Sequence, residues 1–275
     1  MTLARLVGER GAVLRIALII GLAVALGLPV AAELSPIPCA VGNKWEYDTV
    51  KLVRGTVLMD GKTMSGFRDT SSGSSVYEVV AADEKASPVV YDYKETTRTW
   101  STDGGEPDSD TSELKITDDG AALRIVSSYS ESSNEKAPDK QAYEPPLLYY
   151  TVDAVAGKSW DVGVMREREI TNPINARGAG RETITVPAGT FKDCLKVIYS
   201  GDKITGTMDM WEKPFTVTGG KSRGVYWIAE GVGVVKELEV ATTLAESEGP
   251  GGKKLTVEAA SCTVSELRPG YVVKK

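Results

Sequence analysis

The sequence of 275 residues contains no histidine, and only three cysteines and three phenylalanines. Without histidine the chain can form no Ser-His-Asp or Cys-His catalytic pair, no His-ligated zinc or haem, and no histidine pH switch. Its 41% hydrophobic and 25% charged residues are typical of a globular chain, and its length allows one large domain or two small ones. The missing histidine therefore excludes several classes of enzyme and metalloprotein.

Long apolar runs are also scarce, and the prominent one lies near the N-terminus. Three arginines precede an apolar stretch over residues 16–28, which ends shortly before Val30-Ala31-Ala32. A run of 13 residues is too short to span a bilayer as a helix, and the small residues after it suit a cleavage site. We expect residues 1–32 to be a signal peptide cut after Ala32, with an uncleaved N-terminal anchor as the alternative. Pro38 before Cys39 does not fit lipoprotein processing.

The chain has no surplus of basic side chains. The leader carries three arginines and one glutamate, so the remaining 243 residues hold 29 basic and 37 acidic side chains, a net charge of −8. Such a chain lacks the electrostatic attraction that dominates phosphate binding, which argues against a nucleic-acid partner and against anionic lipid headgroups. No later segment is long and apolar enough to form a membrane-spanning helix, so we expect an exported protein, periplasmic or extracellular, without a transmembrane segment after cleavage.

Apolar residues in the mature chain alternate with polar ones, and Gly, Asp and Ser interrupt them at short intervals. This pattern predicts an all-β fold. Asp60-Gly61, Asp119-Gly120 and Gly219-Gly220 suit hairpin turns. Segments 60–74 and 131–145 are rich in Ser, Gly, Pro and charge, which predicts mobile loops or a linker. We expect strands over 43–53, 75–82, 88–100, 111–117, 121–130, 147–152, 159–171, 181–186, 191–200, 204–213, 223–229, 232–243 and 254–264.

Two stretches suggest an internal duplication. Residues 41–47 read VGNKWEY and residues 156–162 read AGKSWDV, with the tryptophans 115 positions apart. A glycine three positions before the tryptophan suits a turn that delivers the indole to the core as a strand begins. We therefore expect two related β halves, 33–143 and 144–275, although chance similarity over seven residues is the alternative.

The second half contains the most distinctive motifs, VPAGTFKDCLKV over 186–197 and YWIAEGVGVVK over 226–236. Pro187-Ala188-Gly189 predicts a turn between two strands, and Gly231 and Gly233 bracket a second reversal that places Trp227 and Val234 on neighbouring strands. Together with GNKWEY these motifs resemble a family of exported bacterial β-domains sometimes labelled TapB-like. The resemblance implies an antiparallel, strongly curved sheet or barrel-like fold in the cell envelope, and supplies no catalytic residues.

Three cysteines cannot all pair within one chain. If the first and last strands pair antiparallel, Cys39 and Cys262 come close enough for a disulfide, which is the pairing we favour over the other pairings and the fully reduced state. Alternation over 191–200 places Cys194 on the more polar face of its strand, next to two lysines that favour its thiolate. A redox or metal-sensing role is the alternative to a partly buried, inert thiol, which we favour because no general base is available.

Other candidate sites have weaker signals. Asp103, Glu106, Asp108, Asp110 and Glu113 form an acidic segment that could hold Ca²⁺, although its spacing is not that of a known calcium loop and a solvated loop is the simpler interpretation. Among the five tryptophans, Trp45, Trp160 and Trp227 are candidates to line a ligand cleft or to belong to the core. Otherwise the sequence predicts no catalytic residues, no metal and no cofactor.

Three functional hypotheses follow. The first is a non-enzymatic envelope domain that binds an apolar or amphiphilic ligand, such as a lipid, or another envelope protein, on the concave side of a curved sheet. The second is a purely structural or assembly module whose interior is filled by its own side chains. The third is a hydrolase that acts through paired carboxylates, which are abundant but not singled out by any motif.

Overall fold

The computed structural model describes residues 38–101, 107–132, 137–211 and 213–274. These residues form one antiparallel sheet of thirteen strands, so the all-β prediction is confirmed. The strands are β1 (Lys44–Met59), β2 (Lys62–Asp83), β3 (Val89–Ser101), β4 (Asp108–Asp118), β5 (Ala122–Ser132), β6 (Asp139–Thr151), β7 (Ser159–Glu167), β8 (Ile170–Val186), β9 (Gly189–Gly201), β10 (Gly206–Met210), β11 (Lys213–Ala229), β12 (Gly233–Glu248) and β13 (Lys254–Leu267).

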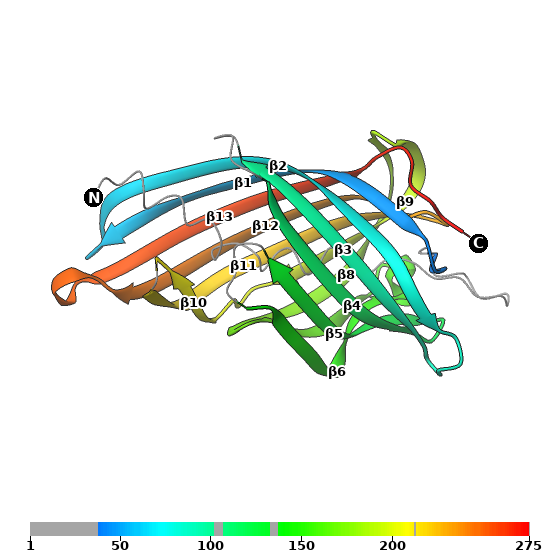
Figure 1. The fold of residues 1–275 in the computed structure, drawn as a ribbon, viewed down its shortest axis with the longest axis horizontal. Helices are drawn as coiled ribbons and strands as arrows, with labels where there is room; N and C mark the ends of the chain where they lie inside the picture. Colours follow the sequence, from blue (N-terminus) through cyan, green and yellow to red (C-terminus); the bar gives the residue numbers. More distant parts are fainter. Residues whose placement is uncertain (1–37, 102–106, 133–136, 212, 275) are drawn as a thin grey trace.

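The sheet is an up-and-down meander that curls until it nearly closes into a barrel (Figure 1). Its order is β6-β5-β4-β3-β2-β1-β13-β12-β11-β9-β8-β7, and the short β10 pairs with β11 outside this path. The first and last strands pair antiparallel in the middle of the order, from Tyr47 opposite Leu267 to Met59 opposite Leu255. The two edges are therefore β6 and β7, which follow one another along the chain.

Side chains join these two edges. The indole Nε1 of Trp160 on β7 donates to the carbonyl of Leu148 on β6 at 3.0 Å, and the hydroxyl of Tyr143 on β6 donates to the carbonyl of Arg166 on β7 at 3.2 Å. A short 3₁₀ helix, η3 (Val152–Ala156), links the two strands and ends at Gly157, whose φ of 74° suits glycine. Exposed sheet edges invite pairing with other chains, and these contacts cover part of both.

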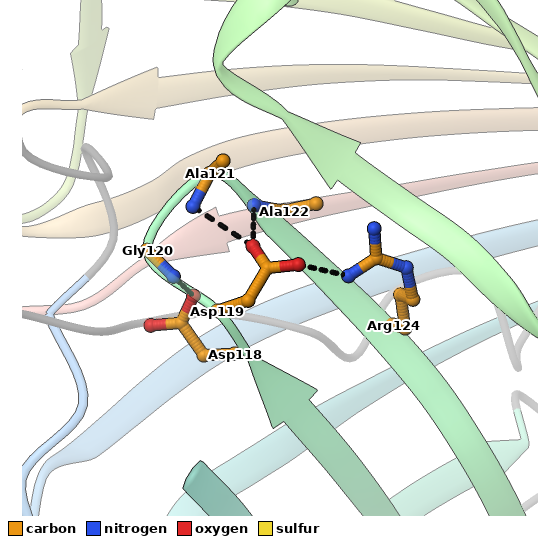
Figure 2. A network of polar contacts seen from close by, with 6 residues as sticks. All are labelled: Asp118, Asp119, Gly120, Ala121, Ala122 and Arg124. Carbon is orange, nitrogen blue, oxygen red and sulfur yellow. Dashed lines mark hydrogen bonds and ion pairs between the residues drawn. The ribbon is translucent and has the colours of Figure 1, made fainter. Parts of the chain in front are cut away.

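Two of the three predicted hairpin turns are confirmed. Asp60 and Gly61 have positive φ between β1 and β2. At the β4–β5 turn, the carboxylate of Asp119 accepts from the backbone N–H groups of Ala121 and Ala122 and pairs with Arg124 at 2.6 Å (Figure 2). The prediction for Gly219-Gly220 is wrong, because both residues lie inside β11, where the register with β12 shifts.

Both turns in the distinctive motifs are observed. Val186 and Gly189 face one another across Pro187-Ala188, which joins β8 to β9. Gly231 and Gly233 have positive φ in the turn that joins β11 to β12, so Trp227 and Val234 lie on paired strands as expected.

The two segments predicted as mobile loops consist largely of strand. Most of 60–74 belongs to β2, which is 22 residues long, and 131–145 contains the end of β5 and the first half of β6, apart from 133–136, which lie outside the described residues. These strands were misread because many of their inward side chains are polar: Ser71 and Ser75 of β2 are both buried. A polar face was interpreted as a solvated loop, whereas here it lines the inside of a barrel.

Two predictions about organisation receive no test from the fold. The expected signal peptide, 1–32, lies outside the described residues. The two tryptophan turns are alike in backbone, since Gly42 before β1 and Gly157 before β7 both have positive φ, but 33–143 and 144–275 contribute to one continuous sheet. No helix in the described ranges is long and apolar enough to cross a membrane.

Candidate binding site in the barrel interior

The barrel interior is apolar at both ends and polar between them. At one end, the core cluster includes Trp45, Tyr93, Tyr199 and Tyr226, each of which is almost fully buried. At the other, the far cluster includes Ile204, Met208, Phe215, Val217 and Val257. The β12–β13 pair shows that these are opposite ends, because Val235 of the core cluster and Ala245 of the far cluster lie ten residues apart along β12.

Between the clusters, inward positions carry polar side chains, which we call the polar belt. Alternation identifies the inward face: on β12, Glu237 and Glu239 are buried whereas Val240 is 40% exposed, and on β13, Ser261 is buried whereas Cys262 is half-buried. The belt consists of Lys51, Ser71, Ser75, Glu95, Thr97, Asn172, Ser222, Glu237, Glu239, Thr243, Ser261, Thr263 and Ser265, of which all but Lys51 are buried.

Three carboxyl groups dominate the belt, and each has a hydroxyl neighbour. Glu95 on β3 accepts from the hydroxyl of Thr97 at 2.9 Å, and that hydroxyl also lies 2.9 Å from Ser75 Oγ on β2. On β12, Glu239 accepts from the Tyr226 hydroxyl of β11, and Glu237 is hydrogen-bonded to Ser265 of β13. Each carboxyl therefore has a partner, as buried polar groups require.

Burial raises the pKa of all three carboxyls. The pKa of Glu95 rises to about 7, and hydrogen bonds from Tyr77 and Thr97 only partly offset the loss of solvation. The pKa of Glu237 rises to about 8, first through burial and then through the charge of Glu95. Burial and the neighbouring charge of Glu237 raise the pKa of Glu239 well above its usual range. The three acids thus share one electrostatic environment, in which Glu237 and Glu239 hold protons at neutral pH and Glu95 is about half protonated.

Two buried polar atoms in the belt have no hydrogen-bond partner. They are Ser261 Oγ on β13 and Asn172 Oδ1 on β8, whose residues are 3% and 1% exposed. The other amide atom of Asn172 donates to Ser222 Oγ at 2.9 Å, and Ser222 lies opposite Ala241, which lies opposite Ser261. An unmade buried hydrogen bond costs about 1–3 kcal/mol. These two atoms are therefore candidates to bind a water molecule or a polar group of a ligand.

One wall of the interior is partly open to solvent. The inward residues Lys51, Val53 and Val57 of β1 are half-buried, unlike the buried positions that they face on β13, and Phe67 of β2, opposite Gly55, is also half-buried. A Cβ at Gly55 would come within 2.3 Å of Phe67 Cζ, so the glycine lets that ring lie directly on β1. This apolar surface leads from the polar belt to the far cluster, with which Val57 and Phe67 pack.

The three candidate tryptophans do not form one cleft. Trp45 is 1% exposed in the core cluster and donates to the carbonyl of Val232 at 2.7 Å. Trp160 lies at the β6–β7 junction and packs edge-on against Tyr199. The indole Nε1 of Trp227 donates to Glu182 at 2.7 Å, and the ammonium of Lys196 lies over its ring. Trp227 therefore contacts these two charged side chains and does not belong to the polar belt.

The predicted Cys39–Cys262 disulfide is wrong. The first and last strands do pair, but Cys262 lies opposite Leu52, eight residues along β1 from Lys44, which is about 27 Å at the rise of a strand. Cys39 is buried in the core cluster, where its thiol contacts the Tyr93 hydroxyl and burial raises its pKa. None of the three cysteines, all within the described ranges, forms a disulfide.

The prediction that Cys194 occupies a polar face is also wrong. Cys194 is fully buried next to the buried Leu195, because Asp193 takes a positive φ and the register with β8 shifts there. Such a bulge breaks the alternation on which the prediction depended. Burial raises the pKa of Cys194, which opposes the thiolate that its lysine neighbours would favour.

The acidic segment considered for calcium is divided by the fold. Asp103 and Glu106 lie outside the described residues, while Asp108, Asp110 and Glu113 belong to β4. Asp108 and Asp110 are on one face of that strand, and Glu113 is on the opposite, exposed face. In the parts of the chain that are described, no group of three or more acidic or cysteine side chains is arranged to hold a metal ion.

The sequence analysis did not single out the buried carboxyls, because in β12 they alternate with apolar residues that a sequence pattern would place in the core. Residues 234–241 read VVKELEVA, in which Leu238 and Val240 form the apolar set. In the barrel these two face outward with Val264, while the glutamates face inward. The usable signal was Glu-x-Glu within an otherwise apolar run paired with a strand rich in small hydroxyl residues, 259–265.

Comparisons with known proteins reach only part of the chain or are distant. A family model described as DUF3108-like matches residues 136–239, which includes both distinctive motifs, Glu237 and Glu239, while the TapB-like label is not confirmed. No curated protein sequence matches the chain.

Chains from three bacteria are among the solved structures that match. A Bacteroides fragilis protein described as exported, with a YmcC-like fold, is 14% identical over 82% of this chain and 95% of its own, with a TM-score of 0.32. A Parabacteroides distasonis chain described as a lipoprotein is 15% identical over 86% and 99%, with a TM-score of 0.32. The transport unit of the Escherichia coli autotransporter AIDA-I is 10% identical over 90% and 96%, with a TM-score of 0.20. At these scores the likeness carries no argument about function.

Proposed function

We propose that this protein is an exported, non-enzymatic β-barrel that binds an amphiphilic molecule on its concave face. Its polar group lies in the polar belt and its apolar part lies along Val53, Val57 and Phe67. Export is inferred from the leader at 1–32, and binding from the interior.

One observation carries the proposal: the interior runs from a filled apolar core, through a buried polar belt, to a half-buried apolar wall. A barrel that served only as a scaffold gains nothing from burying three carboxyls, since apolar side chains in their place would avoid the desolvation cost. An amphiphile matches this arrangement, because its polar group can lie in the belt while its apolar part lies along the wall.

The structural-module alternative is supported by the core cluster. There the rings of Tyr149 and Tyr199 stack at 5.3 Å, Tyr226 packs edge-on at 5.1 Å, and Tyr47 packs against Tyr77 at 5.2 Å, so this end is filled by the protein itself. The two interpretations differ at the other end, where the wall on β1 and β2 is half-buried.

The hydrolase alternative receives less support. Hydrolysis by paired carboxyls needs one ionised group beside a protonated one, and here burial raises the pKa of all three buried glutamates.

Binding is tested with a naphthylamine dye that fluoresces in apolar surroundings, followed by displacement with a non-ionic alkyl maltoside. The informative variant is Val53→Asp on the inward face, and the matched control is Leu52→Asp, which is equally half-buried but faces outward on the same strand. We expect Val53→Asp to abolish dye binding and Leu52→Asp to retain it. Equal effects of the two variants, or no saturable dye binding by the wild-type chain, would contradict the proposal.

A further inference from the structure

The polar belt carries more acid than base. Glu95, Glu237 and Glu239 point inward from β3 and β12, with Asp69 of β2 on the same inward face nearer the half-buried wall. Lys51 of β1 is the cationic belt member, and its charge favours the ionised form of Glu239. Once two or more of these carboxyls have released their protons, their negative charge exceeds the charge of the one ammonium, so an incoming anion meets net repulsion and an incoming cation meets attraction.

A second, independent observation supports ligand binding in the belt. Ser261 Oγ and Asn172 Oδ1 are unpartnered and buried, and both face the interior on the inward faces of β13 and β8. Ser261 is the inward residue next to Thr263, which lies opposite Glu239, so Ser261 and Glu239 are diagonal neighbours across the β12–β13 pair, about 7–8 Å apart. Both atoms can accept a hydrogen bond, as the carboxylates can.

The nature of the cation follows from the lining. Over the described residues no set of side chains converges on a metal ion, and the belt is surrounded by tyrosine rings, namely Tyr47, Tyr77, Tyr149 and Tyr226. Carboxylates, hydroxyl acceptors and aromatic rings together are the groups that recognise ammonium ions of organic molecules.

We propose that the belt binds the ammonium group of a cationic amphiphile, with Glu237 and Glu239 as its counter-charges and with Ser261 as a hydrogen-bond acceptor. This inference rests on the proposed function and adds the charge of the ligand. Lys51 then occupies part of the site when it is empty, as an internal competitor for the same carboxylates.

Affinity for the cation rises with pH. In the empty barrel the glutamates hold protons near neutral pH, and a bound ammonium must displace them, so binding strengthens as pH increases through the pKa of Glu237 at about 8. The charged and titratable groups that face these acids are Tyr226 of β11, Tyr149 of β6, Tyr47 and Lys51 of β1, Tyr77 of β2 and Glu95 of β3. The tyrosines have pKa values raised by burial and stay neutral over this range.

The experiment compares three probes of equal chain length by calorimetry below their micelle concentrations: dodecylammonium, dodecyl sulfate and dodecyl maltoside. We expect dodecylammonium to bind most tightly, and its affinity to rise between pH 6 and pH 8.5, where the probe itself remains charged. Glu237→Gln with Glu239→Gln should weaken dodecylammonium binding by about tenfold or more and leave dodecyl maltoside unchanged. Lys51→Met should strengthen dodecylammonium binding, with Arg54→Met on the outward face of the same strand as the control.

The outcomes separate this inference from the proposed function. Equal binding of the three probes, or a Lys51→Met variant that loses cation affinity, overturns the charge preference while amphiphile binding stands. Absence of binding by any probe overturns both. Tighter dodecylammonium binding by Lys51→Met cannot arise from misfolding, so this variant still tests the inference if the double glutamine variant is unstable. Near-ultraviolet circular dichroism establishes that each variant is folded.

Discussion

The buried carboxyls predict that the folded state loses stability as pH rises through neutrality. The pKa of Glu95 is about 7 in the folded protein and 4.5 in its unperturbed state. Between these values the folded chain binds a proton at this site that the unfolded chain has released. The free energy of unfolding therefore decreases with pH, is greatest below pH 4.5 as far as this group is concerned, and levels off above pH 7.

The magnitude follows from the shift. A difference of roughly 2.5 pH units at about 1.4 kcal/mol per unit gives roughly 3–4 kcal/mol from Glu95, most of which is lost between pH 5 and pH 8. Glu237 and Glu239 act in the same direction, because burial raises the pKa of each. A domain is stable by only about 5–15 kcal/mol, so the effect is a large share of the total.

Urea unfolding at pH 5 and pH 8 measures this loss directly, with Glu95→Gln as the informative variant. Glutamine imitates the protonated acid and can still accept from the Thr97 hydroxyl. We expect the loss between the two pH values to be smaller in Glu95→Gln by about 2–3 kcal/mol, and Glu113→Gln, an exposed site on the neighbouring β4, to behave as the wild type. A wild-type stability that is flat or rises over this range, or an unchanged loss in Glu95→Gln, would refute the reasoning.

Three further predictions concern the fold. A thiol reagent should modify Cys262 in the native protein and Cys39 and Cys194 only after unfolding, since the first is half-buried and the others are buried with raised pKa values; three rapidly reacting thiols would contradict this. Gly178→Ala should destabilise the protein by about 1–3 kcal/mol, because its Cβ would lie 1.8 Å from the carbonyl of Ala154, whereas Gly219→Ala meets nothing within 4 Å and should be close to neutral by thermal unfolding. Trp160→Phe should cost about 1 kcal/mol and speed amide exchange along β6 and β7 by removing the bond to Leu148, with Trp100→Phe, an exposed site, showing no change in exchange.

Local patterns in the sequence predicted most of the strands and turns. Thirteen strands were expected and thirteen are present among the described residues, although the expected strand 159–171 runs through the turn at Arg168 that separates β7 from β8. Asp60, Gly61 and Gly231 adopt the positive φ angles of their turns. The first and last strands do pair, as the disulfide argument assumed. Strand lengths were not: β2 and β8 extend well beyond their apolar residues, since a ladder of backbone hydrogen bonds continues through polar side chains.

Positions that depend on the face of a strand were predicted less well. The bulge at Asp193 places Cys194 in the core and not on the polar face of its strand. The register of β1 with β13 places Cys262 opposite Leu52, far from Cys39, although the two strands pair. Neither a bulge nor a register leaves a clear signature in a single sequence. Both decide which side chains meet inside the barrel, and with them the whole candidate site.

In the central part of strands β12 and β13, the apolar side chains face outward and the polar side chains face the barrel interior. Leu238, Val240 and Val264 face outward, while Glu237, Glu239 and Thr263 of the same strands face inward. A shift of these strands by one residue would bury the apolar side chains and expose the acids. The hydrophobic pattern of these strands therefore does not determine the observed register. The filled aromatic core at Trp45, Tyr47 and Tyr226 determines it, because β1 and β11 cannot shift without removing these rings from their partners at Val232, Val234 and Glu239. The core cluster thus fixes the register, and the register holds the carboxyls inside the barrel, where the proposed ligand meets them.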